Sequence, residues 1–448
     1  MTSRARNWIA VFLIVAVVAA VVGWTWWRAP ARGVDHVQSH VPFVPAPAID
    51  FVPGGVEELW RADAPMSTGP FTVDGLALAA TGNGVSALNP ATGEEFWSYH
   101  RDADLCAAMV SQGRVVTVFR GPAGCGEVTS LDAADGSYAA TRRGLAPDDV
   151  EPVRSNNRAG IRHADMVELW RDDLVRTIEY GTVEASPEPN LQPHPGCSVV
   201  DAMTRVDLLA VVNDCPDGHR LVLQDVTPDE SRSPELHADV ELPGPARLVA
   251  IATGRAAVLM DGEIVVYDIE GRRGPTYSPD TFVPEQAAGD ELPPPPEPPV
   301  EPGPEEAGPE DPGAATPGPA PEPATEPLPL PDVVPDDRDG TMPAPIIGDL
   351  PHHMTWFTGS ELILMNPDDL SVHFTVPGAL GPGIGVAGRI LVPVEDGILV
   401  VDWSDGSHGH VIPVDRSGSP GGPVTLSVAG ATLVEKRGDQ LVGLRPLR

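Results

Sequence analysis

The sequence predicts an all-β protein, an eight-bladed β-propeller that follows a single N-terminal transmembrane helix; seven blades is the alternative count. One short pattern recurs eight times along the chain. Short runs rich in Val, Leu and Ile are separated by Gly, Pro, Asp and Asn, as in strands joined by turns. One uninterrupted apolar segment lies near the N-terminus, over residues 8–27.

The recurring pattern is clearest over residues 85–97, which read Val85-Ser-Ala-Leu-Asn89-Pro-Ala-Thr-Gly93-Glu-Glu-Phe-Trp97, and again over residues 128–138, where Asp132 and Gly136 take the places of Asn89 and Gly93. The equivalents of Asn89 in the other six copies are Arg171, Asp225, Asp268, Asn366, Asp402 and Arg445. Asn89 and its equivalents follow one another at intervals of 36 to 54 residues once a proline-rich insert is discounted. This period is typical of four-stranded propeller blades. Asx-to-Gly steps favour tight turns, and Trp97 is expected to pack between blades.

The apolar segment has the length and flanks of a membrane anchor. Its twenty uncharged residues are long enough to span a hydrocarbon core of ~30 Å. Trp8 begins the segment and Trp24, Trp26 and Trp27 end it, as expected at membrane interfaces. Arg4 and Arg6 predict that residues 1–7 stay in the cytoplasm, although Arg28 and Arg32 on the far side weaken this charge bias. The alternative is a signal peptide cleaved after Ala29-Pro-Ala31, but the apolar stretch exceeds the ~7–15 residues of a signal sequence.

The remaining chain divides into a stalk and a propeller. Residues 28–55 are rich in Pro, Val and Ala and predict an extended stalk. Residues 56–448 hold the repeats, but the last repeat ends without a Trp-bearing outer strand. The segment around Trp60 resembles that missing strand, so we expect residues 56–63 to complete the last blade and close the ring.

A proline- and glutamate-rich insert interrupts the propeller at residues 284–345. About twenty prolines lie in it, and residues 285–340 hold fifteen Asp and Glu against one Arg. Such a segment buries too little apolar surface to order itself, so we expect it to be disordered, between the fifth and sixth blades.

The four cysteines form two matched pairs. Cys106 and Cys125 are 19 residues apart, and Cys197 and Cys215 are 18 apart. Each pair falls within one repeat, the first cysteine beginning an inner strand and the second opening the third strand. This spacing predicts the disulfides Cys106–Cys125 and Cys197–Cys215, hence an oxidising compartment. A zinc site of four thiolates is the alternative, but its usual close cysteine pairs are absent from the sequence.

The net charge of −35 bears on partners. Nucleic acid and anionic surfaces repel so acidic a chain, so no nucleic-acid partner is expected. We expect localisation to the cytoplasmic membrane by a single pass, with the N-terminus cytoplasmic and the propeller outside.

The pattern Ala87-Leu-Asn89-Pro-Ala-Thr-Gly93-Glu-Glu-Phe-Trp97 resembles the PQQ-like propeller repeat. The resemblance implies the propeller fold over residues 56–448. Proteins with this repeat include quinoprotein alcohol and glucose dehydrogenases as well as non-catalytic scaffolds such as the outer-membrane assembly lipoprotein. The chain is also similar to actinobacterial membrane-anchored proteins with this ectodomain. The dehydrogenases carry adjacent cysteines above the quinone and a calcium-ligand set, and this sequence shows neither.

No motif points to chemistry. The pairs His352-His353 and His408-x-His410 are expected to be solvated, and no catalytic, cofactor-binding or metal residue is assigned. We therefore expect a non-catalytic module that binds or scaffolds proteins of the cell envelope. The alternatives are a quinone- or metal-dependent oxidoreductase and a sensor or binding module for envelope polysaccharide or peptide. A carboxylate cluster in the funnel would favour the enzyme, and an exposed apolar patch would favour partner binding.

Overall fold

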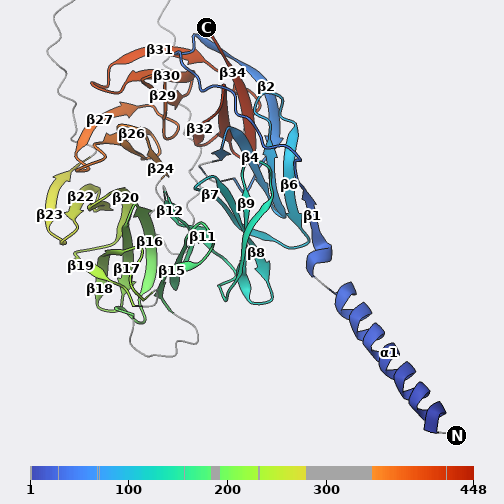
Figure 1. The fold of residues 1–448 in the computed structure, drawn as a ribbon. Coiled ribbons are helices and arrows are strands. Elements are labelled where there is room, and N and C mark those ends of the chain that lie inside the picture. Colours follow the sequence, from blue (N-terminus) through green and yellow to red (C-terminus); the bar gives the residue numbers. More distant parts are fainter. Residues whose placement is uncertain are drawn as a thin grey trace, which may run out of the picture.

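A computed structural model describes residues 3–28, 30–67, 69, 71–155, 157–182, 192–230, 233–278, 346–419 and 421–448. Within them lie helix α1 (Ser3–Trp27), the short helix η1 (Pro30–Gly33), and strands arranged as eight sheets around a central axis (Figure 1). The prediction of an eight-bladed, all-β propeller is confirmed. Residues 284–345, where the insert was predicted, lie outside the described residues; blades 5 and 6 flank them, as expected.

We number the sheets as blades 1 to 8 and name their strands from the axis outwards. Blade 1 holds β3 (Thr72–Val73), β4 (Leu76–Thr81), β5 (Gly84–Leu88), β6 (Glu95–Arg101) and β1 (Val34–Val37); blade 2 holds β7 (Leu105–Ser111), β8 (Arg114–Gly121), β9 (Gly124–Asp132) and β10 (Tyr138–Arg143). Blade 3 holds β11 (Glu151–Pro152), β13 (Ala159–His163), β14 (Met166–Trp170) and β15 (Arg176–Gly181); blade 4 holds β12 (Arg154–Ser155), β16 (Ser198–Arg205), β17 (Leu208–Cys215), β18 (Gly218–Asp225) and β19 (Leu236–Leu242). Blade 5 holds β20 (Ala246–Ala252), β21 (Arg255–Met260), β22 (Glu263–Asp268) and β23 (Arg273–Tyr277); blade 6 holds β24 (Ile346–Asp349), β25 (Met354–Phe357), β26 (Glu361–Met365) and β27 (Val372–Pro377). Blade 7 holds β28 (Ile384–Val386), β29 (Arg389–Val394), β30 (Gly397–Asp402) and β31 (His408–Pro413); blade 8 holds β32 (Val424–Ala429), β33 (Thr432–Arg437), β34 (Gln440–Leu447) and β2 (Gly55–Asp63).

The core is divided among the joints between blades. Each of the eight buried apolar clusters in the described residues is built from two consecutive blades, including one between blade 8 and blade 1. The middle strands are therefore covered on both faces, which explains their continuous apolar runs, such as Leu208–Val212 in β17.

The ring closes as predicted. Strand β2 pairs antiparallel with β34, with Val56 opposite Pro446 and Asp63 opposite Gln440. The first propeller strand therefore completes the last blade, which covers the sheet edge that β34 would otherwise expose.

The segment expected to be a stalk differs from that expectation. It is extended, but residues 34–54, here called the strap, lie against the ring. Strand β1 pairs with β6, and the backbone N–H groups of Ser39 and Phe43 donate to carbonyls of the blade 2 turn. The strap then passes blades 1 and 8, and Ile49 is buried between blades 7 and 8. These backbone contacts leave no repeat pattern in the strap itself, so its sequence alone resembled a linker.

Helix α1 projects from the ring near blades 1 and 2 (Figure 1). The most apolar stretch of 18 residues within Arg6–Trp27 has a mean hydropathy of 2.5, and none of that stretch is buried against the propeller. The helix therefore fits a membrane anchor or a signal sequence, and it includes the predicted span 8–27.

Candidate functional site

The six residues predicted for the repeat turns form joints between blades. The Asn89 Oδ1 accepts a hydrogen bond from the Ala91 N–H at 3.0 Å, and Asp132 repeats this contact in blade 2. Gly93 and Gly136 have φ angles of 74° and 75°, a conformation that favours glycine. These turns follow β5 and β9, where the sequence placed them.

Each of these two turns receives a tryptophan from the preceding blade. The Trp60 indole N–H donates to the Pro90 carbonyl at 2.7 Å, and that of Trp97 donates to the Ala133 carbonyl at 2.8 Å. A Cβ atom at Gly93 would lie 2.5 Å from the Trp60 ring, and one at Gly136 would lie 2.8 Å from Trp97. The two glycines therefore have a structural role: they allow the positive φ of the turn and leave room for the indole ring that packs on it.

Two further turns have the same arrangement of a turn glycine under a side chain of the preceding blade, which the sequence did not predict. Phe374 of blade 6 lies on Gly406 of the blade 7 turn, and Val240 of blade 4 lies near Gly271 of the blade 5 turn. The four-residue spacing from Asp402 to Gly406, equal to that from Asn89 to Gly93, is the signal that identifies the first of these.

The structure contains both predicted disulfides, Cys106–Cys125 and Cys197–Cys215. Cys106 lies at a bulge in β7, and Cys125 near the start of the third strand, β9, as expected. The second pair is placed differently: Cys197 directly precedes β16, but Cys215 ends the second strand, β17, rather than opening the third. The turn at Pro216-Asp217 follows Cys215 and separates it from the third strand, β18.

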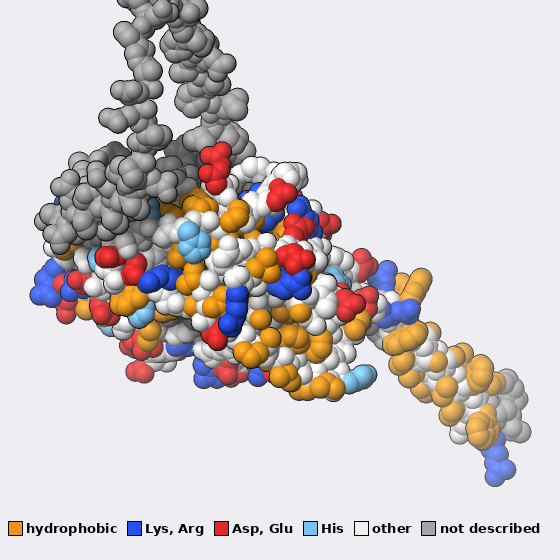
Figure 2. All heavy atoms as spheres, turned by 90° about the horizontal axis from the view of Figure 1, so that it is seen from above, with side chains coloured by type: hydrophobic (Ala, Val, Ile, Leu, Met, Phe, Trp, Pro, Cys, Tyr) orange, Lys and Arg blue, Asp and Glu red, His pale blue; other side chains and the backbone are white. Residues whose placement is uncertain are grey.

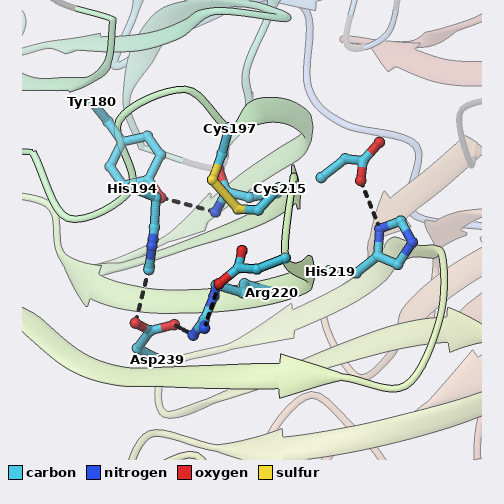
Figure 3. Close-up of a disulfide and its surroundings, with 10 residues drawn as sticks. Tyr180, His194, Cys197, Cys215, His219, Arg220 and Asp239 are labelled. Atoms are coloured by element: carbon cyan, nitrogen blue, oxygen red, sulfur yellow. Dashed lines mark hydrogen bonds and ion pairs between the residues drawn. A yellow bond between two sulfur atoms is a disulfide. The ribbon is translucent and has the colours of Figure 1, made fainter.

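The second disulfide lies beside His194, for which the sequence predicted no role (Figure 3). The His194 Nε2 is 2.9 Å from the Asp239 carboxylate, and possible ligand atoms of His194, Cys197 and Cys215 lie within 4.8 Å of one another. Zinc requires cysteine as the thiolate, so the disulfide removes two of the three ligands. In the described part of the chain this is the one such group.

Breaking this disulfide is expected to lower the free energy of unfolding. Replacing Cys197 and Cys215 by serine frees an 18-residue loop, which the chain-entropy model values at about 3 kcal/mol. Urea denaturation of the variant measures the change. Cys106 and Cys125 remain bonded and serve as the control, since reductant should destabilise the variant further. A loss below about 1 kcal/mol would contradict the assignment of this bond as a main stabilising link.

The histidine pairs contact protein groups. His352 stacks on Trp403 at 4.2 Å, the His353 Nε2 is 2.9 Å from the His373 Nδ1, and His410 is 3.1 Å from the Pro53 carbonyl. His353 is buried, contrary to the expectation that these pairs are solvated. Burial, followed by the nearby His373 and His352, lowers the pKa of His353 from 6.5 to about 4.

This pKa makes stability depend on pH. Between pH 6.5 and pH 4 the unfolded chain binds a proton at His353 that the folded chain does not, so stability falls as the pH falls. The loss should be on the order of 3 kcal/mol. Urea denaturation at pH 7 and pH 4.5 should show a smaller difference for His353→Gln than for the parent, while the exposed His40→Gln should behave like the parent. Equal pH slopes for His353→Gln and the parent would contradict this role.

A polar cluster lies on the inner strands of blades 3 to 5. Asp201 on β16 is fully buried and accepts hydrogen bonds from the Arg154 Nη2 at 2.6 and 2.7 Å and from the Leu248 N–H at 3.1 Å. Arg162 and Arg247 both donate to the Val200 carbonyl, at 3.2 and 2.5 Å. Strand β12, which follows β11 of blade 3 along the chain, supplies Arg154 by pairing in parallel with β16 of blade 4.

This axial arginine cluster carries an excess of positive charge. Its three guanidiniums face two carboxylates, Asp201 and Glu151. Burial lowers the pKa of Arg247; the neighbouring guanidiniums act in the same direction, and Asp201 opposes them. Within the described residues Arg247 has no ion pair at a carboxylate. The arrangement suits an anion such as a carboxylate or phosphate, and it contains one fully buried carboxylate rather than a catalytic pair.

The strap presents an apolar strip to solvent. Val37, Val41 and Val44 are 49%, 65% and 82% exposed. Pro42, Pro45 and Pro47 between and beyond them are exposed as well. Hydrophobic side chains also gather in patches between charged groups on the rim seen in Figure 2. Several exposed apolar side chains on one short segment are typical of a surface that binds another protein.

Comparisons with known proteins agree with the fold. Residues 51–192, less than half of the chain, match the family model described as outer membrane protein assembly factor BamB. A solved structure of BamB from Moraxella catarrhalis is 11% identical with a TM-score of 0.45, covering 87% of this chain and 99% of that chain. Quinohemoprotein alcohol dehydrogenase from Comamonas testosteroni is 12% identical with a TM-score of 0.49, covering 90% and 78%. No curated protein matches. The family match and the eight blades of four or five strands support a PQQ-like β-propeller protein.

Proposed function

We propose that this chain is a membrane-anchored, extracytoplasmic propeller that binds a protein of the cell envelope as a non-catalytic scaffold. The observation that carries the proposal is the apolar strip of the strap. Val41 and Val44 remain exposed although the strap is fixed to the ring on both sides of them. A rigid, exposed apolar strip loses little entropy on binding, so it suits a protein partner.

Two further features support the proposed location. Helix α1 fits an anchor, and the two disulfides fit an oxidising compartment outside the cytoplasm. The family match to an outer-membrane assembly factor over residues 51–192 agrees with a scaffold in the envelope.

Site-specific photocrosslinking in cells tests this function. A photoreactive residue at Val44 is expected to capture one reproducible envelope protein, and the same residue at Val175, exposed on blade 3, is expected not to. Adding Val37→Asp and Val41→Asp should reduce the Val44 product by about fivefold or more, because charges replace apolar contacts. Equal capture from Val44 and Val175, or no product above background, would contradict the proposal.

The axial arginine cluster favours a second candidate, a module that binds an acidic envelope polysaccharide or peptide. Titration of the detergent-solubilised chain with oligoglutamate should then give salt-dependent binding, weakened about tenfold by Arg247→Gln. Arg273→Gln, at an exposed position of blade 5, is the matched control. Equal affinity for both variants would exclude the cluster as the binding site.

A further inference from the structure

A hollow lies where the anchor meets the rim of the ring. It has a volume of about 380 Å³ and is lined from the anchor side by Trp27, Arg28 and Arg32 and from the propeller side by Arg101, Arg120 and Glu127. The short helix η1 and strand β1 fix the anchor side, because the Asp102 N–H donates to the Gly33 carbonyl at 2.6 Å and β1 pairs with β6.

The tryptophans at the end of α1 indicate where this hollow lies relative to a bilayer. Trp24, Trp26 and Trp27 end the apolar helix, and indoles prefer the boundary between hydrocarbon and headgroups. The Arg28 guanidinium lies 4.2 Å from the centre of the Trp24 ring, and that of Arg32 lies 4.5 Å from the Trp26 ring. If α1 spans the bilayer, both guanidiniums lie at the level of the lipid phosphates.

The charges of the hollow are unequally matched. On the propeller side, Glu127 is shared by Arg101 at 2.5 Å and Arg143 at 2.9 Å, and Arg120 contacts Asp148 at 2.7 Å. In contrast, neither Arg28 nor Arg32 has a carboxylate partner among the described residues. Two guanidiniums therefore remain for an anion at this place, although the chain as a whole has a net charge of −35 and repels anionic surfaces. Much of that negative charge is local to residues 285–340, away from the anchor in the sequence.

The adjoining hollow limits where an anion can lie. It has a volume of about 550 Å³, shares Arg101 and Asp102 with the first, and adds Asp35 and Asp104. Asp102 lines both hollows, and it repels a phosphate together with Asp35 and Asp104. The part of the first hollow beside Arg28 and Arg32 is therefore the most favourable place for an anion.

We propose that this hollow binds the phosphate of an anionic membrane phospholipid and thereby holds the rim of blades 1 and 2 against the bilayer. The inference rests on the proposed function, because it requires α1 to be embedded. Arginine suits the ligand, since its planar fork binds phosphate through paired hydrogen bonds. The consequence is a fixed orientation, with the rim of the ring, rather than either face, toward the membrane.

Native mass spectrometry of the full chain, purified from nanodiscs containing phosphatidylcholine and phosphatidylglycerol, tests the proposal. The parent is expected to retain phosphatidylglycerol in preference to phosphatidylcholine. Arg28→Gln with Arg32→Gln should lower this retention about fivefold or more. Arg4→Gln with Arg6→Gln, at the other end of the same helix, is the matched control and should leave retention unchanged.

The outcomes separate the proposal from its alternatives. Equal losses from the two double variants would show general attraction to headgroups and overturn it. Displacement of the lipid by millimolar inorganic phosphate would overturn it in favour of a free anion. Alkaline extraction of native membranes tests the anchor separately. Release of the chain from the membrane would contradict both the proposed anchoring and this inference. A chain that stays in the membrane but shows no preference for phosphatidylglycerol would contradict this inference alone.

Discussion

Replacing Glu435 by alanine is expected to lower the free energy of unfolding by about 3–5 kcal/mol. The Glu435 carboxylate is 0% exposed and lies 2.6 Å from the Arg437 Nε and 2.8 Å from the Arg416 Nη2. Arg437 is itself only 1% exposed, so the substitution leaves a buried guanidinium without its carboxylate. Urea denaturation monitored by tryptophan fluorescence measures the loss.

The matched control for this prediction is Glu263→Ala, at an exposed position on β22, which should change stability by less than about 0.5 kcal/mol. Replacing Glu435 and Arg437 together by leucine should restore part of the loss, because it removes the stranded charge as well as its partner. A loss below about 1 kcal/mol for Glu435→Ala would show that water or a rearranged side chain compensates the arginines.

Replacing Trp97 by alanine is expected to cost about 3–5 kcal/mol. The ring is fully buried between blades 1 and 2, and its indole N–H holds the Ala133 carbonyl. The variant therefore loses apolar contacts, opens a cavity and leaves a buried carbonyl without its donor. Thermal and urea unfolding of the variant measure the combined cost.

Two variants separate these contributions. Trp97→Phe keeps most of the apolar contact and loses the hydrogen bond, so it should cost about 1–3 kcal/mol. Trp403→Ala, at a partly exposed position on the blade 7 turn, should cost the least. If Trp97→Ala and Trp403→Ala were equally stable, the tryptophan joints would not be what holds neighbouring blades together.

The sequence revealed the parts of the fold that repeat. The turn from Asn89 to Gly93 depends only on residues close together in the sequence. Its repeats therefore made the blades predictable, and the resemblance around Trp60 made the closure predictable. The strap was not predictable, because many of its contacts are backbone hydrogen bonds to turns about 90 residues away, such as that from Phe43 to Ala134, and its buried side chains, such as Ile49, follow no repeat. Such pairings place few demands on side-chain identity.

The candidate sites were harder to predict for a related reason. Arg154, Arg162 and Arg247 each stand alone in a different strand, and only the ring brings them to the same carbonyl and carboxylate. The hollow beside α1 likewise combines the end of the anchor with blades 1 and 2. Neither set forms a spaced motif, so the sequence showed joints and disulfides but not the polar clusters.

The closing pair of strands has a consequence for synthesis. Glu57 on β2 forms an ion pair with Arg445 on β34, 388 residues further along the chain. At ~5–20 residues per second, β2 waits roughly 20 to 80 seconds for its partner after it has been made. Throughout that time the nascent ring is open and β2 is unpaired, a state prone to wrong strand pairing. Every blade but the last can therefore form before β34 is made, while closure must wait until β34 has been synthesised.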